Sequence, residues 1–360
     1  MTTTEEKPQS ALYETIQSQP GEIRAVLEGQ RPEINRAVEL LAQTERIFLA
    51  GTGTSSHAAV VGEHLLRSVG VDARATTNFD FVNYGPHVTA HDAFIEISHR
   101  GSKTYGKLAL ERAREAGATV IGLTGQTSPM SGPEVVIHSA APEVSSTHTA
   151  SYTSNLAALA AIAVGLGERT GQNVETLRQA VQNLPAEFED VLREEGMVVP
   201  LARDLATAGR LVLAGAGPNA VTAREGALKV KESSFITAEG FELETILHGG
   251  LQAIQRGDVA VVIAAHGPAL SRVADLIRAL GHIGAHIMVI ADRRDVADLP
   301  HPGGARFIEY PPVPEALSPI LAVIPLQILA AYTAHFRGTN ADNFRKEEER
   351  YRLAGESYQL

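Results

Sequence analysis

One local pattern occurs twice in this chain and constrains its fold more than any other feature. Residues 46–50 form a short apolar run that leads into the turn GTGTSS at 51–56. Residues 211–214 form a second apolar run that leads into the turn GAGPNA at 215–220. Residues with helical periodicity follow each turn, and a strand, a glycine-rich turn and a helix are the repeating parts of a doubly wound α/β sheet. The matching positions of the two turns indicate a tandem duplication.

The remaining strands are predicted from apolar runs that helical segments separate. Continuous apolar strands that alternate with helices are typical of parallel sheets covered on both faces. We therefore expect an α/β protein that contains two tandem, doubly wound parallel sheets. The expected strands are 73–77, 93–98, 120–123 and 135–138 in the first half, and 259–264, 287–291 and 306–310 in the second half.

Helical segments are predicted before, between and after the strands. Pro20 and Gly21 are expected to break one N-terminal helix from the next. The helical stretch between the two halves is expected to be interrupted near 196–200, and the last helix is expected to begin at Pro319 with Ser318 as its N-cap. The expected divisions are an N-terminal helical segment 1–45, a first domain 46–170, a helical linker 171–206, a second domain 207–340 and a C-terminal tail 341–360.

Composition limits the partners and the compartment. The 360 residues, 44% of them hydrophobic, are enough to bury two cores, and the net charge of −11 argues against nucleic acid as a partner. The sequence has no cysteine, which excludes disulfides, thiolate metal sites and a thiol nucleophile. The first ten residues lack the features of a secretory leader, and no run approaches the ~18 apolar residues of a membrane span. We expect a soluble cytoplasmic protein.

The stretch 225–250 carries the chemistry that most suggests a function. Glu225, Lys229 and Glu232 follow one another at steps of four and three, so they share one face of a predicted helix. His248 follows in a glycine-rich turn that we expect to be buried. A carboxylate and an imidazole held together can move a proton between adjacent carbons of a sugar. Taken alone, Glu232 is also explained as an ion-pair partner of Lys229 on a solvated face, and His248 as a structural histidine.

Other short patterns were weighed for an anion, a dinucleotide or a metal. Arg100 and Lys103 precede a predicted helix, where cations oppose the helix dipole, and this favours a bound anion over two solvated charges. Neither glycine-rich turn completes the G-x-G-x-x-G pattern of a dinucleotide site. His87 and His91 are four residues apart but lie in the predicted loop HVTAHD. We expect no metal site and no cofactor.

Several of these motifs occur together in one known family. The chain resembles the double sugar-isomerase (SIS) domain proteins, and most nearly the isomerase half of glucosamine-6-phosphate synthase, over about residues 46–353. The resemblance implies two flavodoxin-like SIS lobes. It is carried by EGALKVKE at 225–232, LHGG at 247–250, GTS at 53–55, SHRG at 98–101, STHTAS at 146–151 and RGT at 337–339.

The resemblance implies that the first lobe holds an anionic sugar. The family pattern S-x-S-G-x-T uses neutral hydroxyls, whereas this chain has SHRGSK at 98–103, with Arg100 and Lys103 in place of the second serine and the threonine. Arginine binds oxyanions bidentately and lysine adds a point charge. The anion is therefore either a phosphate held differently or another anion such as a sulfonate. The implied substrate-binding residues are Thr54, Ser55, Ser98, His99, Arg100, Gly101, Ser102, Lys103, Ser146, His148 and Thr149.

The resemblance also implies catalytic roles. Glu232 holds the position of the base that moves a proton between C1 and C2 of the open-chain sugar, and His248 that of the histidine that assists ring opening, often from a second subunit. The synthase forms a Schiff base through a lysine near its C-terminus. Glu349 holds that position here, so the lysine is missing unless Lys346 substitutes from one turn away. The chain has no cysteine and no preceding glutaminase segment, so glutamine-dependent amide transfer is not expected.

These expectations lead to one function and several alternatives. The leading hypothesis is an aldose–ketose isomerase, dimeric or larger, that acts on an anionic hexose through a cis-enediol. Alternatives with the same chemistry are a glucosamine-6-phosphate deaminase, a fructosamine-phosphate deglycase and a sulfosugar isomerase. A non-catalytic sugar-phosphate sensor and a structural assembly protein are alternatives from other classes. A small anionic sugar is the expected partner, with no nucleic acid and no membrane.

Overall fold

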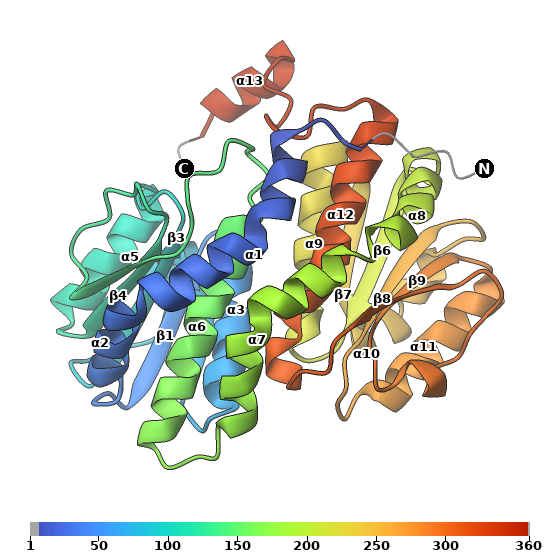
Figure 1. Cartoon of the computed structure of the whole chain (residues 1–360). Helices are drawn as coiled ribbons and strands as arrows, with labels where there is room; N and C mark the ends of the chain where they lie inside the picture. The colour runs from blue at the N-terminus through green and yellow to red at the C-terminus, as the bar shows by residue number, and fades with distance from the viewer. Residues whose placement is uncertain (1–6, 359–360) are drawn as a thin grey trace.

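The chain forms two α/β lobes side by side (Figure 1). The computed structural model describes residues 7–358, within which the strands assemble into two five-stranded parallel sheets. The first sheet contains β1 (Arg46–Gly51), β2 (Ala73–Thr77), β3 (Asp92–Ser98), β4 (Thr119–Thr124) and β5 (Val135–His138). The second contains β6 (Arg210–Gly215), β7 (Thr237–Glu242), β8 (Val259–Ala264), β9 (His286–Asp292) and β10 (Arg306–Tyr310). The predicted fold class is confirmed.

The two sheets have the same topology. The strand order is β2-β1-β3-β4-β5 in the first lobe and β7-β6-β8-β9-β10 in the second, and all pairs are parallel. In each lobe the order reverses beside the first strand, so the connections after β1 and β3 leave the sheet at a topological switch point, where open α/β sheets bind ligands. The repeated topology supports the predicted duplication. The sequence patterns missed β7, because this edge strand is mostly polar and only partly buried.

Helices surround both sheets and fill the space between them. Figure 1 shows α3, α6, α9 and α12 in the middle layer, α5 outside the first sheet, and α10 and α11 outside the second. The helices are α1 (Ala11–Gly29), α2 (Arg31–Leu41), α3 (Thr54–Arg67), α4 (Asn78–Asn83), α5 (Thr104–Glu115), α6 (Ala150–Arg169), α7 (Glu175–Leu192), α8 (Glu195–Ala208), α9 (Pro218–Ser234), α10 (Leu243–Leu247), α11 (Leu270–Ile283), α12 (Pro319–Arg337) and α13 (Glu349–Glu356).

Two predicted helix boundaries are wrong, whereas the last helix begins at Pro319 as predicted but without the predicted cap. The helix α1 continues through Pro20, because burial of its apolar face offsets the one backbone hydrogen bond that a proline removes. The helical stretch between the lobes is interrupted after α7 at residues 193–194, and 196–200 lie inside α8. Ser318 precedes α12 but makes no side-chain cap, because its hydroxyl donates to the Glu315 carbonyl at 2.7 Å instead.

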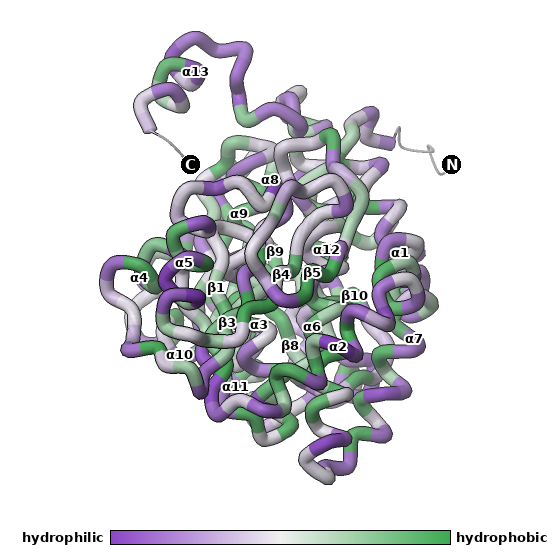
Figure 2. Tube along the Cα trace, turned by 90° about the vertical axis from the view of Figure 1, so that its left-hand side faces the viewer, coloured by the Kyte–Doolittle hydropathy of each residue, from purple (hydrophilic) through white to green (hydrophobic). Residues whose placement is uncertain are grey.

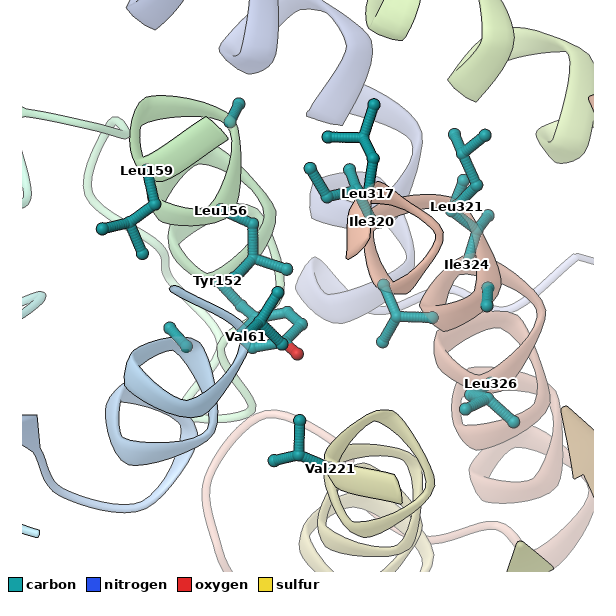
Figure 3. Close-up of a cluster of buried hydrophobic side chains, with 14 of the residues drawn as sticks. Val61, Tyr152, Leu156, Leu159, Val221, Leu317, Ile320, Leu321, Ile324 and Leu326 are labelled. Atoms are coloured by element: carbon teal, nitrogen blue, oxygen red, sulfur yellow. The ribbon is translucent and has the colours of Figure 1, made fainter. Parts of the chain in front are cut away.

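One hydrophobic core connects the lobes. It joins α3 and α6 of the first lobe to α9 and α12 of the second, and it includes Tyr152, Val221 and Ile324 (Figure 3). Two segments do reach the length and apolarity of a membrane span, Ala150–Arg169 and Glu315–Arg337, contrary to expectation. Of these windows 89% and 94% is buried inside the protein, so they are core helices.

The last helix differs from all of these. Figures 1 and 2 show α13 standing away from the body of the protein. None of its residues is buried, and Tyr351, Leu353 and the following Tyr358 expose large apolar side chains. The tail nevertheless returns over the first lobe, where it contributes to the cavity described next.

Candidate functional site

A cavity of about 750 Å³ opens at the switch point of the first sheet. Its walls come from the turns after β1 and β3, the start of α6, the helix α9 of the second lobe and the C-terminal tail. Among the residues singled out from the sequence, the lining includes Thr54, Ser55, Ser98, His99, Arg100, Ser102, Lys103, Ser146, His148, Glu232 and Lys346.

The turn after β1 brings hydroxyl groups to this cavity. The buried strand β1 ends at Gly51, where a Cβ atom would lie 2.5 Å from the Ser55 carbonyl carbon. Gly53 has φ 62° and ψ −129°, a conformation that favours glycine, and α3 starts at the next residue. Thr54 and Ser55 are thus the first residues of a helix whose N-terminus faces the cavity, which suits an anion.

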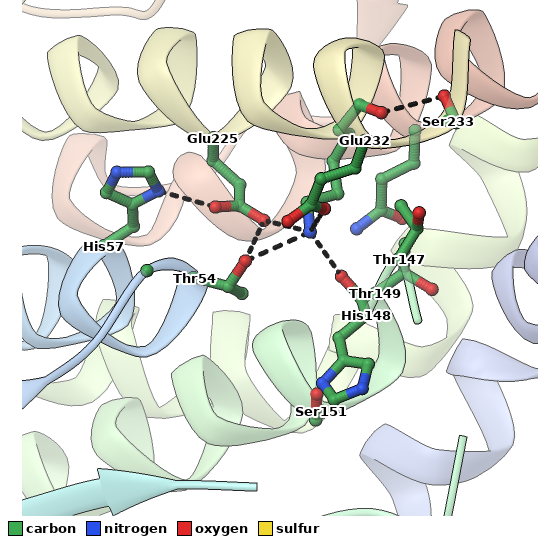
Figure 4. A network of polar contacts seen from close by, with 12 residues as sticks. Thr54, His57, Thr147, His148, Thr149, Ser151, Glu225, Glu232 and Ser233 are labelled. Atoms are coloured by element: carbon green, nitrogen blue, oxygen red, sulfur yellow. Dashed lines mark hydrogen bonds and ion pairs between the residues drawn. The ribbon is translucent and has the colours of Figure 1, made fainter. Parts of the chain in front are cut away.

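The charged face of α9 is buried between the lobes. The Lys229 ammonium is 3.4 Å from Glu225 Oε1 and 2.6 Å from Glu232 Oε2. The side chains of Glu225, Lys229 and Glu232 are 0%, 1% and 20% exposed, so these residues do not form a solvated helix face. Figure 4 shows Glu225 and Glu232 on the same side of their helix, with their carboxylates turned toward Thr54 of the first lobe. The helical spacing seen in the sequence therefore produces a buried triad of charges.

The triad is tied to the first lobe by hydrogen bonds. Lys229 Nζ donates to Thr54 Oγ1 at 3.1 Å and to the His148 carbonyl at 3.0 Å. Glu225 accepts a hydrogen bond from Thr54 and lies 2.6 Å from His57 Nδ1 on α3. Both lobes are thus needed to satisfy the groups around Lys229.

Burial and neighbouring charges set the protonation of the triad. Burial tends to raise the pKa of Glu225, but Lys229 and His57 outweigh it and hold that pKa below its ordinary value. Burial raises the pKa of Glu232, with Lys229 only partly opposing the rise. The two carboxylates raise the pKa of Lys229 despite its burial. Glu232 is therefore a stronger base than a solvated carboxylate, beside an ammonium that stays charged.

Cations without carboxylate partners face the same cavity. Arg100 and Lys103 follow β3, and Lys346 comes from the tail. In the described part of the chain none of the three forms an ion pair with a carboxylate. Burial and the charge of Arg100 lower the pKa of Lys103. An anionic ligand would relieve this repulsion, because charge-assisted hydrogen bonds to oxyanions are strong.

A buried carboxyl group supports the cavity from behind. Glu96 lies in the middle of β3 with 0% exposure and accepts a 2.8 Å hydrogen bond from Asn78, which lines the cavity. Burial raises the pKa of Glu96 to about 8. Glu96 Oε2 and Asn78 Oδ1 make no hydrogen bond within residues 7–358, and a proton on Glu96 would give the carboxyl group a donor. We did not identify this pair from the sequence, although a glutamate within an apolar strand was a usable signal.

Some predicted residues lie elsewhere. Gly101 does not line the cavity and has φ 62° in the turn after β3, where a Cβ atom would lie 2.0 Å from Ser128 Oγ. Thr149 is fully buried beneath the cavity wall, and Glu349 starts α13 outside the lining. The tail instead contributes Phe344, Tyr351, Arg352, Gly355 and Tyr358, none of which the sequence patterns identified.

His248 is outside the cavity of its own chain. It follows α10, its side chain is 75% exposed, and Nε2 lies 3.2 Å from Glu244 Oε2. The prediction of a buried turn is therefore wrong, because the short helix α10 buries only Leu243 and Ile246 and leaves its C-terminal end in solvent. The catalytic role of His248 stays a prediction.

Comparisons with known proteins place the chain in a family. It is 29% identical over 342 residues to a glutamine–fructose-6-phosphate aminotransferase (isomerizing) of Pyrococcus horikoshii, an alignment that covers 92% of this chain and 56% of that protein. The fold is similar to the C-terminal domain of glucosamine-fructose-6-phosphate aminotransferase from Francisella tularensis, with a TM-score of 0.86, 18% identity and coverage of 93% and 98%. It is also similar to tagatose-6-phosphate ketose/aldose isomerase from Escherichia coli, with a TM-score of 0.74, 20% identity and coverage of 93% and 95%.

The chain thus spans little more than half the length of its sequence relative, and it matches the whole of the structural ones. The SIS domain matches it twice, at residues 40–165 and 204–334. These two segments contain the two parallel sheets and the helix α9 with its buried triad. The chain belongs to the SIS domain family.

Proposed function

We propose that this protein is an aldose–ketose isomerase that acts on an anionic hexose by proton transfer between C1 and C2. One observation carries the proposal: the buried Glu232 carboxylate, with its raised pKa, faces the same cavity as the unpaired cations Arg100 and Lys103. A base and an anion subsite in one cavity suit a sugar that is charged at C6 and reacts at C1 and C2.

The proposed proton transfer needs one carboxylate. Glu232 takes the proton from C2 of the open-chain aldose, the electron pair moves onto the C1 carbonyl oxygen, and the hydroxyl proton of O2 passes to O1 within the resulting cis-enediol intermediate. Glu232 then returns the proton to C1 to give the ketose, so it ends as it began. The Lys229 ammonium lies 2.6 Å from Glu232 and stabilises negative charge that develops on the enediol oxygens.

The ring-opening step is assigned to His248 of a second subunit. His248 is exposed on its own chain and does not reach that chain's cavity. A homodimer or larger assembly would deliver it to the site of a neighbour. Cross-linking combined with mixed assemblies of Glu232→Gln and His248→Asn chains tests this assignment, because only mixed assemblies would regain activity.

A second candidate function is a sulfosugar isomerase, and the residues Arg100 and Lys103 favour it. Side-chain cations in place of neutral hydroxyls suit a sulfonate as well as a phosphate. If the sugar carries an amino group at C2, the same proton shift gives an imine that loses ammonia on hydrolysis, as in a glucosamine-6-phosphate deaminase. A fructosamine-phosphate deglycase would use a closely related step, whereas a sensor would bind the sugar without any exchange.

Proton exchange in D₂O tests the proposal and separates these candidates. The protein is offered glucose-6-phosphate, fructose-6-phosphate, glucosamine-6-phosphate and 6-sulfonated glucose, and deuterium at C1 or C2 is followed by NMR. Glu232→Gln should lower exchange by roughly 10²- to 10⁴-fold, whereas Glu239→Gln, exposed on β7, should not. Release of ammonia would identify a deaminase. Binding without exchange for every sugar would overturn the isomerase in favour of a sensor.

A further inference from the structure

A second cluster of titratable groups lies at the wall of the cavity, where His99 and His148 belong to the lining and Glu143 does not. His99 comes from the turn after β3, and Glu143 and His148 come from the segment that leads into α6. Each offers one ligand atom, and these three atoms all lie within 4.8 Å of one another. The two imidazole rings meet edge to face, with their centroids 4.7 Å apart. None of these three residues acts in the proton transfer proposed above.

The carboxylate of this cluster is held in place by the backbone. Glu143 accepts hydrogen bonds from the N–H groups of Thr149, Ala150 and Ser151, at 2.7, 3.1 and 2.9 Å, so it caps the N-terminus of α6. Burial tends to raise the pKa of Glu143, but His148 and the helix N–H groups outweigh it and lower that pKa. Glu143 is therefore a fixed, ionised ligand whose oxygens keep further lone pairs.

The two imidazoles are partly buried beside Glu143. Burial lowers the pKa of both rings, although Glu143 opposes the shift. His99 Nδ1 is buried and makes no hydrogen bond within the described chain, so one ring nitrogen has no competing partner.

We propose that His99, Glu143 and His148 form a binding site for a first-row divalent cation such as Zn²⁺. Two imidazoles and one carboxylate are a common ligand set for Zn²⁺ and its neighbours in the series, and positions left open would face the cavity. This departs from the expectation of no metal site, which considered only His87 and His91 because they are four residues apart. His99 is distant in the sequence from Glu143 and His148, so no local pattern joins the three ligands.

Geometry and charge set the expected affinity. Metal bonds of ~2.0–2.2 Å place tetrahedral ligand atoms about 3.4 Å apart, so side chains now within 4.8 Å must approach by roughly 1 Å. Arg100 and Lys229 lie close enough to lower the pKa of His148, and the same repulsion opposes a cation. We therefore expect binding in about the micromolar range, weaker than at a structural zinc site.

The backbone of His148 connects the proposed metal site to the proposed reaction centre. Lys229 donates a hydrogen bond to the carbonyl of His148 while its ammonium pairs with Glu232. A metal at the open positions would polarise a sugar carbonyl or hydroxyl as a Lewis acid. The site itself rests on the geometry of the three ligands and not on the proposed isomerase activity.

Titration with metal alone tests the site. The full-length, untagged protein is treated with a chelator, desalted, and titrated with Co²⁺ and with Zn²⁺ by calorimetry and visible absorption. One ion per chain should bind, the Co²⁺ bands should appear on binding, and Zn²⁺ should displace them. His99→Ala and His148→Asn should each weaken binding by roughly 100-fold. Thermal unfolding without metal checks that both variants fold.

A matched control is available in the same lobe. His87 and His91 are exposed, and a His87→Ala/His91→Ala variant should bind Co²⁺ as the parent does. The proposal is overturned if the parent binds no stoichiometric Co²⁺ or Zn²⁺, or if binding follows His87 and His91 instead. Because metal is the only ligand used, this result and the result of the deuterium exchange are independent of each other.

Discussion

The first turns of the two lobes have the same backbone and opposite surroundings. Gly53 has φ 62° and ψ −129°, and Gly217 has φ 52° and ψ −127°, and each is followed directly by a helix. In the first lobe this turn presents Thr54 to an open cavity. In the second lobe the corresponding helix starts with Pro218, and the next residue, Asn219, is fully buried and donates to Ser318 Oγ at 2.8 Å.

The charged side chains also differ between the two lobes at the carboxyl ends of the strands, which are called the first edge and the second edge below. The cations at the first edge, Arg100 and Lys103, have no carboxylate partner among the described residues. At the second edge Arg294 pairs with Asp292 at 2.7 Å, and the Glu315 carboxyl packs against Gly267, where a Cβ atom would lie 2.6 Å from Glu315 Cδ. The second lobe thus supplies its own anions. The comparison teaches that duplication preserved the ligand-binding topology in both lobes, while side chains left it open in one and filled it in the other.

The largest loss of stability is expected for Lys229→Met, because Lys229 connects the two lobes. This change leaves Glu225 buried without its cation, and loss of one partner of a buried ion pair costs about 3–5 kcal/mol. Urea unfolding at pH 7 should report a loss of that size. Lys231→Met, exposed on the same helix, should change the free energy of unfolding by less than about 0.5 kcal/mol. Equal losses in the two variants would contradict an electrostatic connection between the lobes.

Glu96 makes the stability of the first lobe depend on pH. Its pKa is about 8 in the folded protein and near 4.5 in the unfolded chain, so the folded state keeps a proton that the unfolded state loses between these values. The free energy of unfolding therefore declines as pH rises from 4.5 to 8. Between pH 5 and 7 this decline amounts to about 3 kcal/mol.

The Glu96→Gln variant should lack this decline, because glutamine resembles the protonated acid and can still pair with Asn78. Denaturant unfolding at a series of pH values measures how the free energy of unfolding changes with pH in each variant. Glu111→Gln, exposed on α5, is the control and should follow the parent. Parallel curves for parent and Glu96→Gln would show that Glu96 is ionised in the folded state.

Removal of the unpaired cations in the first lobe should weaken sugar binding, whereas removal of the paired cation in the second lobe should not. Arg100→Met with Lys103→Met should weaken binding of fructose-6-phosphate by about 10- to 100-fold, as expected for lost charge-assisted hydrogen bonds. Arg294→Met in the second lobe should leave that affinity unchanged. Titration followed by NMR measures both, and equal weakening by the two changes would refute the assignment of the anion subsite to the first lobe.

The smallest change in the free energy of unfolding is expected for Glu315→Gln. Burial raises the pKa of Glu315 while His266 opposes the rise, so at pH 7 the folded state holds a carboxylate that is slightly unfavourable there. The sign follows from linkage: removing this charge should raise the free energy of unfolding at pH 7, by at most about 1 kcal/mol because the group is partly solvated. Thermal unfolding at pH 5 and 7 checks that the gain is larger at the higher pH.

Most of the fold could be predicted because its strands are apolar and regularly spaced. The strand β8 has the predicted bounds, and the duplicated turns identify the start of each lobe. The strand β7 could not be predicted, because its polar side chains are typical of a loop and only pairing with β6 makes it a strand. Pro20 gave a false helix boundary, because tertiary packing outweighs a local preference.

The candidate site was predictable only where one segment contains its members. The triad on α9 follows from helical spacing within eight residues. By contrast, Asn78 reaches the cavity from α4, a helix of six residues without a clear period, and Glu143 acts through backbone groups that the sequence does not reveal. The surroundings of His248 depended on how α10 packs, which a local pattern does not determine.

The hydrogen bond from Lys229 to the His148 carbonyl also bears on how such a chain can evolve or be divided. The donor belongs to one repeat and the acceptor to the other, and the same core runs through both. After duplication, each copy has come to complete the interior of its neighbour. We therefore expect unfolding to be a single cooperative event, and neither half expressed alone to retain its native packing. Each repeat therefore depends on the other for its folded interior.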